Sequence, residues 1–194
     1  MARVKEFDED AVLDKAVALF WSKGYNGTSA QDLVDHLEIS RSSLYGTYGD
    51  KRTLFLKSLQ RYREKMSGSF IKMIEESDDA EETITAIFKS LLAESRDDSI
   101  PKGCFMVNST VELASFDEEI ADLIRENEKS VVEALCHAIQ KGKDAGQFGN
   151  PNSAQSLARF LFNSITGLRV AARSGAGSTE AMNDIIKNLL YALK

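Results

Sequence analysis

Apolar positions along this chain recur every three or four residues, with polar positions between them. In the first such stretch, residues 9–23, the apolar positions are Leu13, Ala16, Val17 and Phe20. This spacing predicts a helix, with Asp8 as its N-cap and Gly24 as the residue that ends it. Residues 3–7 form a short arm ahead of it. No segment alternates strictly between apolar and polar residues, as a half-buried strand would. The pattern therefore predicts an all-α protein of about nine helices.

Two short helices joined by a tight turn are predicted between residues 28 and 51. Ser29, or Thr28 one residue earlier, is a candidate N-cap of the first, and Ser40 is one for the second. The open side of the second helix carries small, hydrogen-bonding or cationic side chains: Arg41, Ser42, Ser43, Gly46 and Thr47. Such a surface suits close contact with another molecule. A helix-turn-helix places the N-terminal residues of its second helix against base edges in the DNA major groove, and the pattern fits that geometry.

The later helices are longer, and polar loops separate them. Asp50 is the candidate N-cap of a long helix that ends before the polar residues 77–79. Pro101 is expected in the first turn of another helix, because proline is favoured there. The remaining predicted helices cover residues 80–96, 117–144, 153–173 and 178 to near the end. We therefore expect two domains, a helix-turn-helix domain at residues 1–50 and a second helical domain at residues 51–194.

The helix-turn-helix stretch resembles a known family. It is similar to the DNA-binding domain of TetR-family transcriptional repressors at Gly24-Tyr25, Thr28-Ser29, Ile39 through Tyr45, Tyr48, Asp50-Lys51 and Leu54. The similarity covers about the first third of the chain, and the combination of these residues at these spacings is specific. Glu38 departs from the family pattern, which usually has glycine in the turn. A non-glycine residue with positive φ is strained, so either the turn differs slightly or Glu38 tolerates that conformation.

The resemblance implies which residues contact DNA. It places four residues at phosphates, namely Thr28, Ser29, Tyr45 and Lys51, and helix N-termini are themselves good phosphate sites. It assigns base reading to the exposed residues of the second helix: Arg41, Ser42, Ser43, Gly46 and Thr47. For Arg41 two alternatives stand, a bidentate contact with guanine and a contact with a phosphate. For the whole set, the alternative is a solvated polar helix.

By the same resemblance, the second domain encloses an unknown small-molecule effector. The candidate residues are aromatic, sulfur-containing or amide side chains: Phe70, Phe88, Cys104, Phe105, Met106, Asn108, Phe160 and Asn163, with Met73 and Phe162 as further candidates. Apolar walls with a few polar groups are typical of small-molecule sites. Each of these residues has plain core packing as its alternative.

The resemblance also implies that the last two helices pair with those of a second copy, in the four-helix bundle of a homodimer. A two-fold, palindromic operator in double-stranded DNA, read by one motif per subunit, requires such a dimer. The helices carry small and aliphatic residues that permit close packing: Ala154, Leu157, Ala158, Leu161, Ala171, Ala172 and Leu189. Packing of these residues within a monomer is the alternative.

The two cysteines do not indicate a disulfide framework or a metal site. Neither CxxC nor HxxxH spacing is present, so we expect no metal and no cofactor. Cys104 follows Lys102-Gly103 at an expected helix start, where the helix N-terminus and a cation both favour a reactive thiolate. Two interpretations stand for Cys104, a thiol that senses electrophiles or oxidants and an inert buried thiol. Cys136 is expected in the core.

Charge is distributed unevenly along the chain, whose net charge is −6. Residues 1–65 carry 11 Lys+Arg against 10 Asp+Glu, while the rest carries 13 against 20. The local field decides phosphate binding, so the acidic remainder should face away from DNA. Because the first third is only weakly basic, binding should depend on a few well-placed contacts.

Other classes of protein find little support. No apolar run approaches the roughly 18 residues that span a membrane, and the charged N-terminus lacks the apolar core of a signal peptide, so we expect a cytoplasmic protein. The sequence motifs of serine hydrolases, P-loop proteins and zinc proteases are absent, so we expect no enzyme. The sequence predicts a ligand-responsive transcriptional repressor. The alternatives are an activator, and a helical small-molecule-binding protein or enzyme whose N-terminal motif makes protein contacts.

Overall fold

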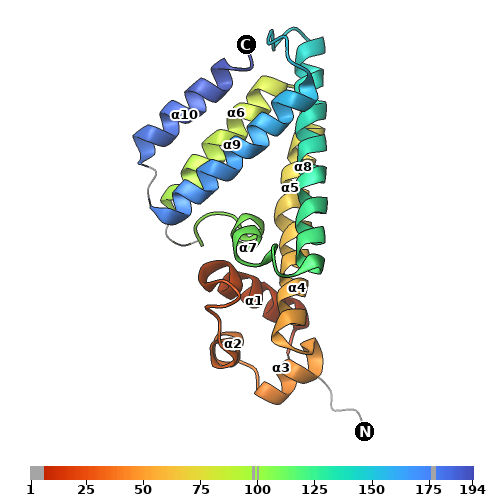
Figure 1. Cartoon of the computed structure of the whole chain (residues 1–194), viewed down its shortest axis with the longest axis vertical. Helices are drawn as coiled ribbons and strands as arrows, with labels where there is room; N and C mark the ends of the chain where they lie inside the picture. The colour runs from red at the N-terminus through yellow and green to blue at the C-terminus, as the bar shows by residue number, and fades with distance from the viewer. Residues whose placement is uncertain (1–6, 98, 100, 176–177) are drawn as a thin grey trace.

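The computed structural model describes residues 7–97, 99, 101–175 and 178–194, which form helices joined by short loops. The molecule is elongated, with its first helices at one end and its last helices at the other (Figure 1). Three short helices come first: α1 (Glu9–Lys23), α2 (Ala30–Leu37) and α3 (Arg41–Tyr48). Of the predicted N-terminal arm, residues 3–6 lie outside the described residues.

A rod of three consecutive elements joins the two ends of the molecule. It consists of α4 (Lys51–Tyr62), the π-helical segment η1 (Arg63–Ser67) and α5 (Gly68–Glu76), which follow one another without a break. The remaining helices are α6 (Ala80–Arg96), α7 (Phe105–Leu113), α8 (Glu118–Asp144), α9 (Ala154–Ser174) and α10 (Thr179–Tyr191). With the rod counted once, the described part of the chain contains nine helices and no strand, which confirms the predicted all-α class.

Short polar side chains cap most of these helices, and the first four caps are at positions predicted from the sequence. Asp8, Ser29, Ser40 and Asp50 each accept a hydrogen bond from a backbone N–H in the first turn of α1, α2, α3 and α4. The same holds at the starts of the later helices α6, α8, α9 and α10, for Asp79, Asp117, Ser153 and Ser178. Because these caps satisfy N–H groups that a helix leaves unpaired, they fix where each helix starts.

The prediction that Pro101 lies in the first turn of a helix is wrong. α7 begins only at Phe105, with Cys104 as the residue before it. Gly103 has a φ of 83°, which belongs to left-handed backbone and cannot continue a right-handed helix. The chain therefore turns at Gly103, and the helix starts after that turn.

Buried side chains form two clusters. The N-terminal cluster comprises residues of α1 to α4 together with α7 and the first turns of α8, and the C-terminal cluster comprises residues of α5, α6, α8, α9 and α10. The predicted boundary after residue 50 separates α4 from the cluster in which it packs. Phe55 of α4 is fully buried there, and its ring meets Phe20, Tyr25 and Phe105 edge-on at centroid distances of 5.0, 5.1 and 5.4 Å.

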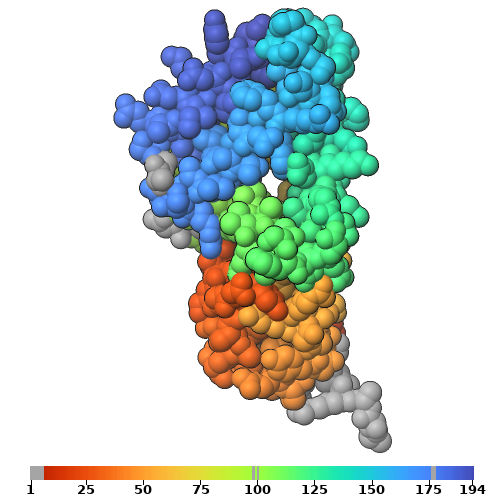
Figure 2. All heavy atoms as spheres, viewed as in Figure 1, coloured from red at the N-terminus to blue at the C-terminus, as the bar shows by residue number. Residues whose placement is uncertain are grey.

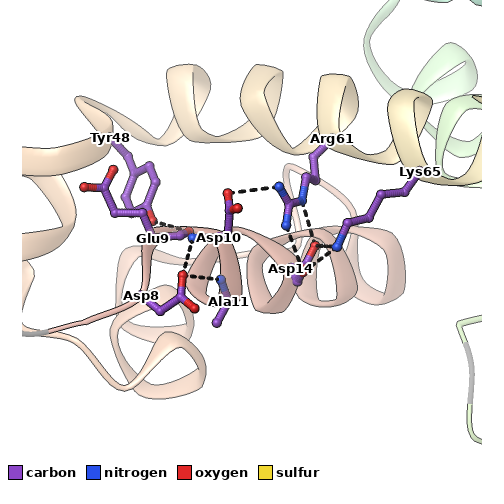
Figure 3. Close-up of polar contacts among 8 residues, drawn as sticks. All are labelled: Asp8, Glu9, Asp10, Ala11, Asp14, Tyr48, Arg61 and Lys65. Carbon is purple, nitrogen blue, oxygen red and sulfur yellow. Dashed lines mark hydrogen bonds and ion pairs between the residues drawn. The ribbon is translucent and has the colours of Figure 1, made fainter.

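Ion pairs hold α1 against the rod (Figure 3). Arg61 Nε and Nη2 donate to the two carboxylate oxygens of Asp14 at 2.9 and 3.1 Å, and its Nη1 reaches Asp10 at 2.9 Å. Lys65 of η1 donates to the same Asp14 carboxylate at 2.6 and 2.8 Å. Arg61 and Lys65 thus hold the pKa of Asp14 down at about 2, with the Arg61 hydrogen bond as the largest cause.

Polar contacts also join the first helices to α7 and α8. Arg52 Nε and Nη2 donate to the Asp117 carboxylate at 2.6 and 2.8 Å, so the start of α4 is tied to the N-cap of α8. Glu112 of α7 accepts the backbone N–H groups of Tyr25 and Asn26 at 3.0 and 2.6 Å. The loop that leads into α2 is therefore fixed to the second half of the chain.

Candidate nucleic-acid interface and internal cavity

α3 presents a polar face at the end of the molecule farthest from α10 (Figure 1). Leu44 and Tyr48 are buried beneath it. On the outer side, the exposed predicted base-reading residues are Arg41, Ser42 and Gly46, while Ser43 and Thr47 are half-buried. Tyr48 fixes the orientation of the helix, since its hydroxyl donates to the backbone oxygen of Glu9 in α1 at 2.9 Å (Figure 3). Burial raises the pKa of Tyr48 to about 12, with nearby Glu9 adding to the effect.

Serine hydroxyls organise the start of α3. Ser40 Oγ accepts the backbone N–H of Ser43 at 3.1 Å and lies 2.9 Å from the hydroxyls of both Ser42 and Ser43. Side-chain hydroxyls that cap a helix are held in place before any partner arrives. Each of the Ser42 and Ser43 hydroxyls makes one of these hydrogen bonds and keeps further hydrogen-bonding capacity for a base.

The predicted phosphate contacts occupy different environments. Ser29, the N-cap of α2, is exposed, and Tyr45 is 39% exposed. Lys51 Nζ lies 4.3 Å above the centre of the Tyr25 ring, and burial lowers the pKa of this lysine. Thr28 is fully buried, and its hydroxyl donates to the Gly24 backbone oxygen at 2.6 Å. The Thr28 side chain therefore fixes the shape of the loop before α2. Because it is buried, it does not face outward to contact a phosphate directly.

Glu38 adopts the left-handed conformation that its place in the turn requires. Its φ and ψ are 57° and 34°, and its N–H donates to the Val34 oxygen at 3.1 Å. Glu38 therefore adopts a left-handed conformation in which glycine is usually favoured. The carboxylate of this strained residue also forms an ion pair with Lys15 of α1.

A cavity of about 490 Å³ lies in the other half of the molecule, between η1, α5, α6, α7, α8 and α9. The surface is hollowed in this region, where α7, α8 and α9 meet (Figure 2). Apolar and sulfur-containing side chains dominate its walls, among them Met66, Phe70, Met73, Met106, Val107 and Phe162. Its volume is within the range of small-molecule sites, about 300–1,000 Å³.

Two family models match this chain. The model of the bacterial regulatory proteins of the tetR family matches residues 12–57, which cover most of α1, all of α2 and α3, and half of α4. The model of the tetracyclin repressor-like C-terminal domain matches residues 80–188, more than half of the chain. The chain belongs to the TetR family. As a TetR-family protein with an intact helix-turn-helix, it is a DNA-binding transcriptional regulator.

Individual TetR-family proteins are similar over nearly the whole chain. The HTH-type transcriptional regulator YezE of Bacillus subtilis is 37% identical over 174 residues, 89% of this chain and 90% of that protein. The repressor ComR of Escherichia coli is 29% identical, over 93% of this chain and 86% of ComR. Among solved structures, a cysteine variant of the regulator CifR bound to a 26-base-pair operator superimposes with a TM-score of 0.86 at 23% identity, over all of both chains. Reduced NemR of E. coli gives 0.83 at 16% identity, over 94% of this chain and 95% of NemR.

In this TetR-family fold, the predicted effector residues separate into two groups. Phe70, Cys104, Met106 and Asn163 line the cavity, as do the further candidates Met73 and Phe162. The other four lie elsewhere: Phe88 is fully buried in the C-terminal cluster, Phe105 is buried in the N-terminal cluster, Asn108 is half-buried beside Gly103, and Phe160 is 45% exposed on α9. None of these four lines the cavity, because their helix positions face another neighbour or solvent.

Polar residues that the sequence did not single out also line the cavity. They are charged or amide side chains of α6, α8 and α9: Glu94, Asn127, Glu128 and Arg169. Arg169 Nη1 lies 3.5 Å from the Glu94 carboxylate and 3.4 Å from the Gly103 backbone oxygen. In the sequence, these four residues occupy polar positions of amphipathic helices, like many solvent-facing residues. No sequence pattern therefore marked them as cavity residues.

Cys104 connects the cavity wall with the N-terminal cluster. Its sulfur accepts a hydrogen bond from the Tyr62 hydroxyl at 3.4 Å. The Tyr62 ring in turn meets Trp21 and Phe105 edge-on at centroid distances of 5.1 and 5.7 Å. Burial, and next the neighbouring Cys104, raise the pKa of Tyr62 well above its usual range. A modification of the Cys104 sulfur would therefore disturb Tyr62, and through Tyr62 the contact with Trp21 of α1.

Within the described ranges, no group of three or more histidine, cysteine or acidic residues is arranged to hold a metal ion. A search of the same residues finds no helix of the length and apolar character that crossing a membrane requires.

Proposed function

We propose that this regulator is a repressor that binds a palindromic operator as a homodimer and leaves it when an effector occupies the cavity. The observation that carries the proposal is the polar outer face of α3, which buried Leu44 and Tyr48 hold at the tip of the molecule. ComR is described as a repressor and the CifR structure contains operator DNA, which supports the same role here. We place the protein in the cytoplasm with the DNA it binds, and assign it no enzymatic role.

The exposed apolar residues of α9 and α10 support the homodimer. Phe160 of α9 and Ile185 of α10 are both 45% exposed, and neither lines the cavity. Exposed apolar residues gathered on one surface mark sites of protein association. Most of the small and aliphatic residues that the sequence suggested for pairing are instead buried within the subunit: Ala154, Leu157, Ala158, Leu161 and Leu189. The pairing surface therefore rests on the larger outer residues.

Selection of bound fragments from sheared DNA of the source genome, at near-physiological salt, tests the DNA-binding role. We expect recovery of a palindromic site, with an affinity that falls steeply as salt rises, because lysine and arginine contacts release counterions from phosphates. Recovery of only non-specific fragments by effector-free protein would contradict the proposal.

Phe160→Glu tests the dimer. A carboxylate in a paired apolar surface is desolvated without a partner, so the variant should sediment as a monomer and lose most of its operator affinity. Phe116→Glu is the matched control, since Phe116 is 86% exposed on the loop between α7 and α8. A dimeric Phe160→Glu variant would argue against pairing through α9.

Modification of Cys104 is a second route to release, favoured by the position of its sulfur on the cavity wall and against Tyr62. A bulky adduct there would break the Tyr62 hydrogen bond and push against the N-terminal cluster. Cys104→Ser should keep operator binding and lose any response to N-ethylmaleimide, while Cys136→Ser should keep both. Release of the Cys104→Ser variant by the reagent would exclude this route.

A further inference from the structure

One buried amide in the cavity wall lacks a hydrogen-bond partner. Asn127 of α8 is 8% exposed, and among the described residues nothing bonds to its Oδ1. An unpaired buried acceptor is unfavourable, and a donor supplied by a ligand would relieve it. The residue lines the 490 Å³ cavity, and the terminal amide torsion is soft, so a small rotation presents the oxygen to a bound molecule.

Asn127 is also the boundary between two cavities. A more polar cavity of about 580 Å³ lies on the other side of η1 and α8, and the two share Ser67 and Asn127 in their walls. In that second cavity, the cation Arg63 is already paired with Glu126 at 2.8 Å. A ligand with an apolar body fits the first cavity, where Asn127 is one of a few polar groups in a largely apolar wall.

The charges around the first cavity favour the same kind of ligand. Two carboxylates line it, those of Glu94 and Glu128, against one guanidinium, that of Arg169. The Arg169 side chain is only 19% exposed, and it already faces Glu94 and the Gly103 backbone oxygen. Glu128 forms no ion pair with any residue in the described part of the chain. A bound carboxylate would meet this excess of negative charge, whereas an ammonium or a hydroxyl would find acceptors.

We propose that the effector of this regulator is an uncharged or cationic molecule with an apolar ring body and an N–H or O–H donor that Asn127 accepts. Glu128 adds selectivity for a positive charge. This inference rests on the proposed effector-dependent release, and it names the class of molecule that would cause it. An anion held by Arg169 is the competing class.

Four fluorescent probes of one shape test the inference: anthracenylmethylamine, anthracenylmethanol, methylanthracene and anthracenecarboxylate, all substituted at the same ring position. Their binding to the full-length protein is measured by fluorescence titration. We expect the amine and the alcohol to bind about tenfold more tightly than the methyl compound, which corresponds to one hydrogen bond to a buried acceptor. The carboxylate should bind most weakly.

Two variants assign the effect to its residues. Asn127→Leu should abolish the advantage of the alcohol over the methyl compound, since the acceptor is gone while the apolar wall remains. Glu128→Gln should weaken the amine several-fold and leave the alcohol unchanged. Glu133→Gln is the matched control, because Glu133 is an exposed carboxylate of α8 outside the cavity lining.

Three results would overturn the inference: tightest binding by the carboxylate, equal binding of all four probes, or binding of none. Operator affinity of the same preparation, measured without a probe, separates this failure from the failure of the proposed function. If the operator still binds while the probes are not discriminated as stated, only the effector class is wrong. If no operator binds, the proposed function fails.

Discussion

The N-terminal cluster and the cavity half of this regulator differ in how completely they are packed. Around Phe55, aromatic rings meet edge-on, and the short helices α1 to α3 all carry side-chain caps. Around the cavity, the helices leave about 490 Å³ open. The first region is densely packed, whereas the second contains space for a ligand.

This difference bears on how the proposed release from DNA would work. A densely packed core has little freedom to deform, so the reading helix moves with its whole domain. The Arg52–Asp117 and Glu112–Tyr25 hydrogen bonds connect the cavity half to that domain. If the proposed function holds, we therefore expect an effector to change the placement of α3 relative to the partner subunit, with no change inside the motif.

The largest expected effect is a difference between the two regions in the unfolding free energy lost when a phenylalanine is truncated. Phe55→Ala should lower the free energy of unfolding by about 3–5 kcal/mol, because a fully buried ring leaves a cavity in a packed core. Phe162→Ala, in a wall that already borders open space, should lower it by less than about 2 kcal/mol. Urea unfolding followed by circular dichroism measures both. Equal losses of unfolding free energy in the two variants would contradict the difference in packing between the two regions.

A smaller effect concerns recognition. Arg41→Ala should weaken operator binding by about 1–3 kcal/mol and relax the preference at one base pair if the side chain reads guanine. Lys89→Ala, an exposed cation of α6, should leave affinity unchanged. Fluorescence anisotropy with operator variants measures both. Uniform weakening at every sequence would instead assign Arg41 to a phosphate, and unchanged affinity would remove it from the interface.

Glu38 provides a comparison within the turn. Glu38→Gly and Glu38→Ala both lose the exposed ion pair with Lys15, but only glycine relieves the φ of 57°. The glycine variant should therefore be more stable than the alanine variant by about 1 kcal/mol. Thermal unfolding of the two proteins in parallel gives this difference. An alanine variant as stable as the glycine variant would show that the left-handed turn stores no strain.

The smallest effect depends on pH. Because Arg61 and Lys65 depress the pKa of Asp14 to about 2, its ion pairs stabilise the folded state above the pKa of an unfolded aspartate, about 3.9. That contribution is lost as the pH falls from about 4 towards 2. The Asp14 side chain is 42% exposed, so the contribution is below about 1 kcal/mol. Asp14→Asn should lower the urea midpoint at pH 6 and approach the wild type at pH 3. A constant difference would assign the effect to packing.

The parts of the fold that sequence alone predicted are those decided locally. Helix starts at Asp8, Ser29, Ser40 and Asp50 follow from hydrogen bonds within a few residues, and all four were correct. Pro101 was misassigned because Gly103 set the true start of α7 through its left-handed backbone. Burial of Thr28 depends on a loop whose path α7 fixes through Glu112, and no local pattern records that contact.

The cavity was only half predictable for the same reason. Aromatic character marks both a core residue such as Phe88 and a wall residue such as Phe70. Which of them faces open space depends on how α5 and α6 are rotated against their neighbours. Glu94 and Asn127 were missed because an acidic residue or an amide in a helix ordinarily faces water. Their place in the wall follows from the assembly of helices distant in the sequence.

The π-helical segment η1 has a consequence for the evolution of this regulator. Met66 and Ser67 belong both to the rod from the DNA-reading domain and to the cavity wall. If the proposed function holds, we expect a substitution at either position to affect both ligand fit and the rod, so changes in effector preference should be constrained there. Adaptation to a new effector should therefore accumulate on α6, α8 and α9, where the wall can vary while the spacing of the DNA readers is preserved.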